Sequence, residues 1–405
     1  MAAISSLSRL LPLSLPLPSL LSTQTLPAIA IHIHIPASLS GIWDSVLRAV
    51  PKKKTSYGKK RSRQLAGKAL KDTIAINKCP ACGAPKRSHL LCPDCVATIT
   101  ITVSSFYHAH PSDIYSLAVT KSHILSVSGA SSLNIHSTSQ PELPLAQSFT
   151  GVHKLGCHHV VTSADGKTAA TVGFDGLVRI WSFNGDSWVE NTDINSSQRI
   201  CDIWAPALSD DGQYLAGTTT DGRVKVWDLL DNATQIRELE SKGSFGMCIS
   251  LSSDGAHTAT GHQSGNVYVF NNETGRIVHS LSGLVEPVRC VAFSPGGKYI
   301  AAAGDSRVIV LYERLSGEQA ANFTGHNSWI TSLDWSETGE YLLSSSLDGK
   351  VKVWSIERNA CVATHSESDQ AIWSVKWLPR FNRTDRFVTA GANRAITFYR
   401  EATGA

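Results

Sequence analysis

The sequence predicts an all-β fold, a seven-bladed β-propeller over residues 97–405. Three observations predict it: a phrase that recurs every 42 to 46 residues, short runs of alternating apolar and polar residues, and turn signals between those runs. Before the propeller we expect a small basic, cysteine-rich module over residues 48–96 and a disordered leader over residues 1–47.

The recurring phrase begins with a turn residue, usually followed by Gly, and ends on an aromatic residue six positions after the turn residue. The clearest copies run from Asp175 to Trp181, from Asp221 to Trp227 and from Asp348 to Trp354. Weaker copies complete a series of seven whose last residues are His136, Trp181, Trp227, Phe270, Tyr312, Trp354 and Tyr399. A fixed period of this length is typical of propellers with four-stranded blades.

Each copy contains two further strand signals before the phrase, such as 288–293 and 299–303, separated by a Ser-Pro-Gly-Gly turn. The last copy stops at its third strand, 398–400, and therefore needs a fourth strand from elsewhere. Residues 98–106 alternate at Ile99, Ile101 and Val103, so we expect them to close the ring and remove an exposed sheet edge.

The best-formed copy places His326 before Asp348 and Trp354, which resembles the His–Ser/Thr–Asp–Trp hydrogen-bond network of WD40 blades. We expect structural roles for these three residues and for Asp175, Trp181, Asp221 and Trp227. Ser, His and Asp are also the residues of a hydrolase triad. Here they recur with the repeat, whereas a nucleophile would occur once, so the sequence favours a protein that is not an enzyme.

A candidate partner-binding surface follows from aligning the copies at the start of the first strand. In WD40 propellers this position lies on the top face around the channel, and rims rich in aromatic residues and Arg are typical binding hot spots. The alternative is that some of these side chains pack inside a blade. The residues are Tyr115, His158, Trp204, Met247, Arg289, Thr331 and Trp373, with Trp329 two positions before Thr331.

A family resemblance appears over about residues 105–402. The segments 113–116, 371–377 and 387–391, with the ending 398–402, resemble the WD40 subunit of the superkiller (Ski) complex. The resemblance implies a cytoplasmic scaffold that joins a helicase and a tetratricopeptide-repeat protein to support 3′→5′ mRNA decay by the exosome. In fungi it also implies an association with meiotic recombination, and therefore with the nucleus. It implies no membrane and no small-molecule substrate as partners.

Four cysteines, Cys79, Cys82, Cys92 and Cys95, form two CxxC pairs separated by nine residues. Two such pairs can hold Zn²⁺ in a tetrahedron of thiolates, so we expect a structural zinc ribbon. A redox role would need only one pair in a βαβ setting.

A basic arm precedes the cysteines, with Lys52, Lys53, Lys54, Lys59, Lys60, Arg61 and Arg63. Clustered Lys and Arg beside a zinc module favour binding to a phosphate backbone, and the alternative is a solvated or nuclear-localisation-like run. Residues 48–96 as a whole resemble large-subunit ribosomal protein thirty-two of the bacterial and mitochondrial type. That resemblance implies rRNA as the partner of the seven basic residues.

The two halves differ in charge and in the compartment that they indicate. Residues 1–97 carry 14 Lys and Arg against 3 Asp and Glu, whereas the remainder carries 23 against 30. The leader has one acidic residue, Asp44, and is rich in Ser, Leu and Pro, which resembles a mitochondrial transit peptide. Three accounts stay open: two neighbouring genes joined in prediction, a fusion cut after import, or a ribosome-attached propeller. We favour the first.

Overall fold

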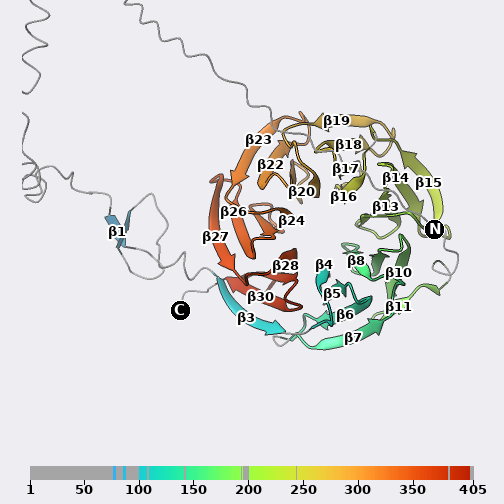
Figure 1. The fold of residues 1–405 in the computed structure, drawn as a ribbon, viewed down its shortest axis with the longest axis horizontal. Coiled ribbons are helices and arrows are strands. Elements are labelled where there is room, and N and C mark those ends of the chain that lie inside the picture. The colour runs from blue at the N-terminus through green and yellow to red at the C-terminus, as the bar shows by residue number, and fades with distance from the viewer. Residues whose placement is uncertain are drawn as a thin grey trace, which may run out of the picture. The chain divides into compact units, whose positions relative to one another are not determined.

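The computed structural model describes residues 109–401, except 141–142, 193, 195–199, 243 and 382–383, together with the backbone of three earlier strands, 76–78, 85–87 and 100–106. Within these residues the chain forms seven four-stranded antiparallel sheets and one two-stranded sheet. The seven sheets are arranged as blades around a central axis (Figure 1). The predicted all-β, seven-bladed propeller is therefore confirmed.

In the first six blades the strands follow one another in chain order from the axis outward, as Figure 1 shows. Blades one and two contain β4 (Ile114–Val119), β5 (His123–Ser128), β6 (Ser132–Ser137), β7 (Leu145–Thr150), β8 (Cys157–Thr162), β9 (Thr168–Gly173), β10 (Val178–Phe183) and β11 (Trp188–Glu190). Blades three and four contain β12 (Pro206–Leu208), β13 (Tyr214–Thr218), β14 (Val224–Asp228), β15 (Thr234–Leu239), β16 (Gly246–Leu251), β17 (His257–His262), β18 (Val267–Asn271) and β19 (Ile277–Leu281).

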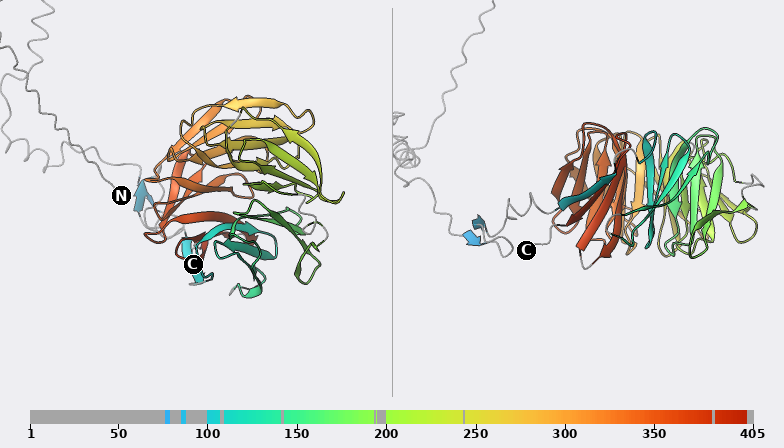
Figure 2. Two further views of the ribbon diagram at one scale, coloured as in Figure 1. Left: turned by 45° about the vertical axis from the view of Figure 1, so that its right-hand side comes forward. Right: turned by 90° about the horizontal axis from the view of Figure 1, so that it is seen from below.

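Blades five and six repeat this order. They contain β20 (Val288–Phe293), β21 (Tyr299–Gly304), β22 (Val308–Glu313), β23 (Gln319–Thr324), β24 (Ile330–Trp335), β25 (Tyr341–Ser346), β26 (Lys350–Ser355) and β27 (Ala360–Ser366). Because successive strands are antiparallel, one end of every blade carries the connections between blades and the turns between second and third strands. We call this end the entry face, since the innermost strands begin there, and the other end the opposite face (Figure 2).

Blade seven joins the two ends of the propeller chain. Its strands β28 (Ile372–Phe381), β29 (Thr384–Gly391) and β30 (Ile396–Glu401) are completed on the outside by β3 (Thr100–Phe106). The β3 and β30 strands run antiparallel, with Thr100 opposite Glu401 and Phe106 opposite Ile396. The expected closing strand is thus present, and the structure describes it from Thr100 to Phe106.

The sequence signals explain the local structure. The Gly of the Asp-Gly turn has a positive φ, 70° at Gly349, and a Cβ there would lie 1.8 Å from the Ser368 carbonyl oxygen. Glycine adopts this conformation without strain, and at Gly349 the close carbonyl leaves no room for a side chain. Along the strands the alternating apolar residues meet those of the next blade, as Leu342 and Trp354 of blade six do with Ala301 of blade five. The core is therefore a series of layers between blades.

Before the propeller, β1 (Ile76–Lys78) and β2 (Pro85–Arg87) form an antiparallel pair in which Lys78 lies opposite Pro85. The predicted leader, the basic arm and the four cysteines lie outside the described residues. Among the residues that are described, none belongs to a helix with the length and apolar character needed to cross a membrane.

Candidate protein-binding face

The predicted rim residues lie where the alignment put them, at the beginning of the innermost strands. Tyr115 is in β4, Arg289 in β20 and Trp373 in β28, while Trp204 lies just before β12. Tyr115, Arg289, Thr331 and Trp373 line one cavity of about 150 Å³. The fold thus brings side chains from four blades together near the axis of the ring.

An unbroken series of aromatic contacts runs along the entry face from blade seven to blade four. Neighbouring ring centroids in the series lie 4.6 to 5.7 Å apart, the range in which aromatic pairs attract. We call the series the aromatic arc; in order its members are Trp373, Tyr115, Phe174, His158, Trp204 and Phe245. The arc places a row of mutually contacting rings along this face, most of them partly exposed.

His158 supports the arc from beneath and offers little surface to a partner, because it is 5% exposed. Its ring stacks on Phe174 at 4.6 Å, and its Nε2–H donates to the Trp204 carbonyl oxygen at 2.9 Å. Burial lowers the pKa of His158 to about 4, so the ring is neutral at pH 7. For His158 the alternative left open by the sequence, packing inside the blade, describes the geometry better than partner contact.

The remaining sector of the rim combines a cation with an indole. The Arg289 guanidinium lies 4.4 Å from the centroid of the Trp329 ring and forms an ion pair with Asp305. Trp329 is 43% exposed. Thr331 instead joins two blades, since its hydroxyl donates to the Ile372 carbonyl oxygen at 2.6 Å. Met247 is half-buried at the start of β16.

Two members of the aromatic arc escaped the sequence alignment. Phe174 lies in the turn between β9 and β10 and is 44% exposed, which makes it the most exposed ring of the arc. Phe245 lies two residues before Met247, the same offset as Trp329 before Thr331. That shared offset is a sequence signal that predicts Phe245 at the rim. Phe174 lies in a turn between the second and third strands, outside the first strands that were aligned.

Away from the rim, the predicted blade network is present in blade six. The Trp354 indole N–H donates to Ser344 Oγ at 2.8 Å, and Ser344 Oγ lies 2.7 Å from His326 Nε2. His326 Nδ1 lies 3.2 Å from Asp348 Oδ2, which also accepts the Asn327 N–H at 2.9 Å. Because the Asp348 carboxylate can only accept, Nδ1 of the neutral ring carries the proton, and Nε2 therefore accepts the Ser344 hydroxyl proton. Burial lowers the pKa of His326 and keeps it neutral.

A second network of the same kind lies in blade two. The sequence predicted two of its members, Asp175 and Trp181. Trp181 donates to Thr171 at 3.1 Å, and Thr171 lies 3.1 Å from His153, whose Nδ1 is 3.3 Å from Asp175. Two copies, both buried, fit a structural role and not an active site. In blade three Trp227 is buried in the core, but Asp221 bonds to Thr219 and Arg223 on the surface and meets no histidine.

The chain matches three family models. Residues 147–182 match the WD domain, G-beta repeat; residues 203–385 match the second β-propeller of echinoderm microtubule-associated protein; and residues 49–102 match the ribosomal L32p protein family. The ribosomal match ends within β3.

Relatives divide in the same way. The meiotic recombination protein rec14 of Schizosaccharomyces pombe is 40% identical over 295 residues, which is 73% of this chain and 95% of rec14. The antiviral protein SKI8 of Saccharomyces cerevisiae is 26% identical over 66% of this chain and 83% of its own length. The large ribosomal subunit protein bL32m of S. pombe is 54% identical over 82 residues, which is 20% of this chain and 79% of bL32m.

Fold, repeat networks and aromatic rim together define a WD40 β-propeller that binds proteins. The chain belongs to the WD-repeat family that includes rec14 and SKI8, and its residues 49–102 belong to the ribosomal L32p family. The two resemblances seen in the sequence are therefore confirmed. In S. pombe the two parts correspond to two separate proteins.

Proposed function

We propose that the propeller is the non-catalytic WD40 scaffold of a Ski-type complex and holds a tetratricopeptide-repeat protein and a helicase in support of exosome-dependent 3′→5′ mRNA decay. The observation that carries the proposal is the aromatic arc, a preformed apolar surface whose rings are held by one another. Rigid aromatic side chains lose little conformational entropy on binding and dominate protein interfaces. The match to SKI8 supports the choice of complex.

The match to rec14 supports a second use of the same scaffold, in meiotic recombination. The same surface would serve both processes, and the partner proteins of the two processes would compete for the aromatic arc. The propeller would then act in the cytoplasm and in the nucleus.

Recovery of the tetratricopeptide-repeat partner with the tagged full chain tests the scaffold function. Trp373→Ala removes one end of the arc, and we expect it to abolish recovery of the partner. Cys79→Ser leaves the propeller intact and is the matched control. Loss of the partner in the Cys79→Ser variant, with retention in the Trp373→Ala variant, would assign partner binding to the N-terminal segment and contradict the proposal.

The alternative function belongs to residues 48–96, as a structural constituent of the mitochondrial large ribosomal subunit. Its support is the 54% identity to bL32m. The strands β1 and β2 pair antiparallel, and Cys79 and Cys82 lie between them in the sequence. With Cys92 and Cys95, four thiolates would hold Zn²⁺, and the arm from Lys52 to Arg63 would contact rRNA.

This alternative is tested on the full chain by its zinc content and by rRNA binding across a salt series. One zinc per chain, lost in Cys79→Ser, and binding that weakens as salt rises are the expected results. Zinc content unchanged by Cys79→Ser would contradict the site.

We further propose that the chain joins two neighbouring genes, because its two parts correspond to two proteins in S. pombe. An immunoblot against the propeller would then show a band near 33 kDa, on the order of 300 residues at the usual mass per residue. A single band at 43.6 kDa would contradict it. Transcripts mapped across codons 90–110 locate the junction, which lies close to the closing strand β3.

A further inference from the structure

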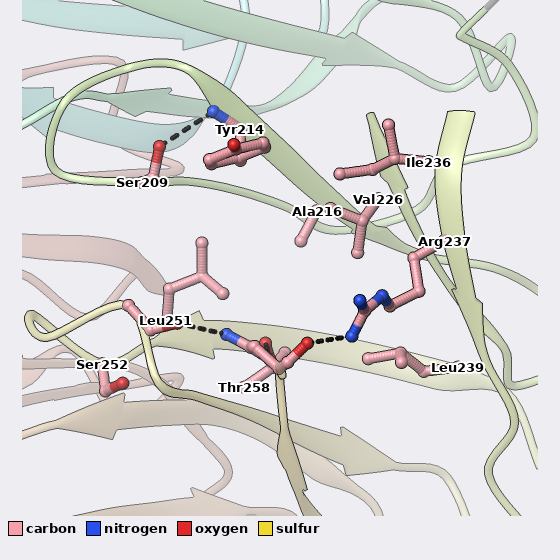
Figure 3. A pocket seen from close by; sticks show the side chains of 12 residues that line it. Ser209, Tyr214, Ala216, Val226, Ile236, Arg237, Leu239, Leu251, Ser252 and Thr258 are labelled. Carbon is pink, nitrogen blue, oxygen red and sulfur yellow. Dashed lines mark hydrogen bonds between the residues drawn. The ribbon is translucent and has the colours of Figure 1, made fainter. Parts of the chain in front are cut away.

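A groove of about 270 Å³ opens between blades three and four (Figure 3). Its walls are mostly apolar. Blade three contributes Ala216, Val226, Ile236 and Leu239, and blade four contributes Leu251 and Thr258. Ile236 on the outer strand β15 is 51% exposed, so the groove is reached from solvent.

At two paired positions blade four has smaller side chains than blades five and six have. Phe293 pairs with Ile300 in blade five, and both pack against blade four. Trp335 pairs with Leu342 in blade six, and both pack against blade five. The corresponding pair in blade four is Leu251 with Thr258. Paired residues on adjacent strands face the same side, so both leave space against blade three.

Thr258 is polar at a position of the repeat where the other six blades have an apolar residue. The residue opposite the last aromatic position of each repeat is apolar in the other six blades: Ile124, Ala169, Leu215, Ile300, Leu342 and Phe387. The Thr258 hydroxyl donates to Asn272 Oδ1 at 2.6 Å, so its hydrogen-bond donor already has an acceptor. What the groove lacks is one large apolar side chain.

The groove lies on the opposite face of the ring from the aromatic arc. Ser209, Ser252 and Gly255 of its lining belong to turns between first and second strands, and these turns are at the ends where the innermost strands finish. A ligand in the groove therefore leaves the entry face free, and this inference does not depend on the proposed scaffold function.

Four carboxylates lie close to lining residues of the groove, next to them in the chain or opposite them in a strand pair. Asp210 and Asp211 follow the lining residue Ser209, Asp228 lies opposite the lining residue Tyr214, and Glu273 follows Asn272. Among the described residues none of these four acids forms an ion pair. Desolvation by the surrounding protein and the neighbouring charge of Asp211 raise the pKa of Asp210, as expected where negative charge is concentrated.

The cation within the groove is already bound. The Arg237 guanidinium donates to the backbone carbonyl oxygens of Asn272 and Glu273, the latter at 2.9 Å. It ties blade three to blade four and forms part of the wall. Arg237 keeps its positive charge, because carbonyl oxygens do not neutralise it, but the four acids close to lining residues outnumber this one cation of the lining.

We propose that this groove binds a peptide segment of a partner protein that carries one aromatic side chain flanked by Lys or Arg residues. The aromatic ring fills the space that Phe293 and Trp335 fill at the next two blade interfaces. The flanking cations face the four carboxylates at the rim, which steers the segment to the groove and weakens its binding as salt rises.

The test measures binding of a fluorescein-labelled pentapeptide, phenylalanine between two pairs of lysines, to the full chain by fluorescence anisotropy. The double variant Leu251→Phe/Thr258→Ile copies the blade-five pair and fills the groove. We expect it to melt at the same or a higher temperature and to bind the peptide at least about tenfold more weakly, the loss of one buried anchor. Ile236→Lys changes an exposed wall residue and should weaken binding without disturbing the fold.

Two controls test the location of the site and the role of the aromatic ring. Leu230→Ala removes an apolar side chain that is 79% exposed and outside the groove lining, and it should bind as the parent chain does. A peptide with alanine in place of phenylalanine should bind at least about tenfold more weakly than the parent peptide. Equal binding by the filled and parent chains, equal binding of the two peptides, or no binding to the parent chain at millimolar peptide would overturn the proposal.

Discussion

Thr102 in β3 lies opposite Tyr399 in β30, so the last blade is closed by a strand that precedes the first blade in the chain. Six residues of β3 have partners in β30. Closure of this kind leaves no open edge between the first and last blades.

The closing strand gives the first prediction. Thr102→Pro in the full chain removes a donor from β3 and disturbs its pairing with β30. We expect a loss of about 3 kcal/mol in the free energy of unfolding and a tendency to aggregate through the uncovered strand β30. Urea unfolding and light scattering measure the two effects. A stable monomer with unchanged unfolding would show that the ring closes without β3.

The blade networks give the second prediction. Asp348→Asn and Asp175→Asn each remove the charged acceptor of a buried histidine, and each should cost about 2 kcal/mol of stability, the usual size for a hydrogen bond to a charged group. Asp221→Asn is the matched control, because the Asp221 side chain is 59% exposed and meets no histidine. It should cost less than about 0.5 kcal/mol. Equal losses in all three variants would contradict the network account.

Backbone strain gives the third prediction. Arg307 stands at the turn position that holds Gly in four other blades, and its φ is 62°. The left-handed conformation costs a residue with a Cβ about 1–2 kcal/mol, while glycine costs some entropy in the unfolded chain. We therefore expect Arg307→Gly to raise the free energy of unfolding by about 0.5 kcal/mol. Gly349→Ala should lower it instead, and a lower melting temperature for Arg307→Gly would refute the strain argument.

Buried histidines give the fourth prediction, a loss of stability in mild acid. Burial lowers the pKa of His110 and His136 to about 4 and that of His159 to about 3, against a usual 6.5. The unfolded chain then binds more protons than the folded chain below pH 6.5. Stability is thus full above pH 6.5 and falls as the pH drops towards 4, by on the order of 3 kcal/mol for each such histidine.

Urea midpoints at pH 7.5 and pH 5 measure this dependence. His159→Ser should reduce the difference between the two midpoints, because serine does not titrate. Serine also suits the site, since Ser116, Ser332 and Ser374 occupy the equivalent position in other blades. Identical midpoints at the two pH values would contradict the pKa directions.

Much of the fold could be predicted because the same short sequence pattern recurs in every blade. The aromatic that ends each phrase is the residue that packs against the preceding blade, so its spacing counts the blades. The closing strand could be inferred from the missing fourth strand after Tyr399. The network in blade six could be predicted because His326 directly follows a glycine, as in the Gly-His pattern of WD40 repeats.

What the sequence did not reveal depends on contacts between blades. His153 follows Gly151 after an extra residue, Val152, so its network in blade two does not match the simple Gly-His pattern. His158 has a residue type common at rims, yet Phe174 and Trp204 cover it. The groove beside Thr258 appears only when strand register shows which neighbours are larger.

The affinity of the purified full chain for the tetratricopeptide-repeat protein of a Ski-type complex tests the central claim most directly. Phe174→Ala/Trp329→Ala removes the two exposed rings of the entry face, and we predict a Kd at least about tenfold higher, as for paired interface hot spots. Leu145→Ala/Val189→Ala removes exposed apolar side chains on outer strands and should leave the Kd within about twofold. An unchanged Kd in the Phe174→Ala/Trp329→Ala variant would contradict partner binding at the entry face.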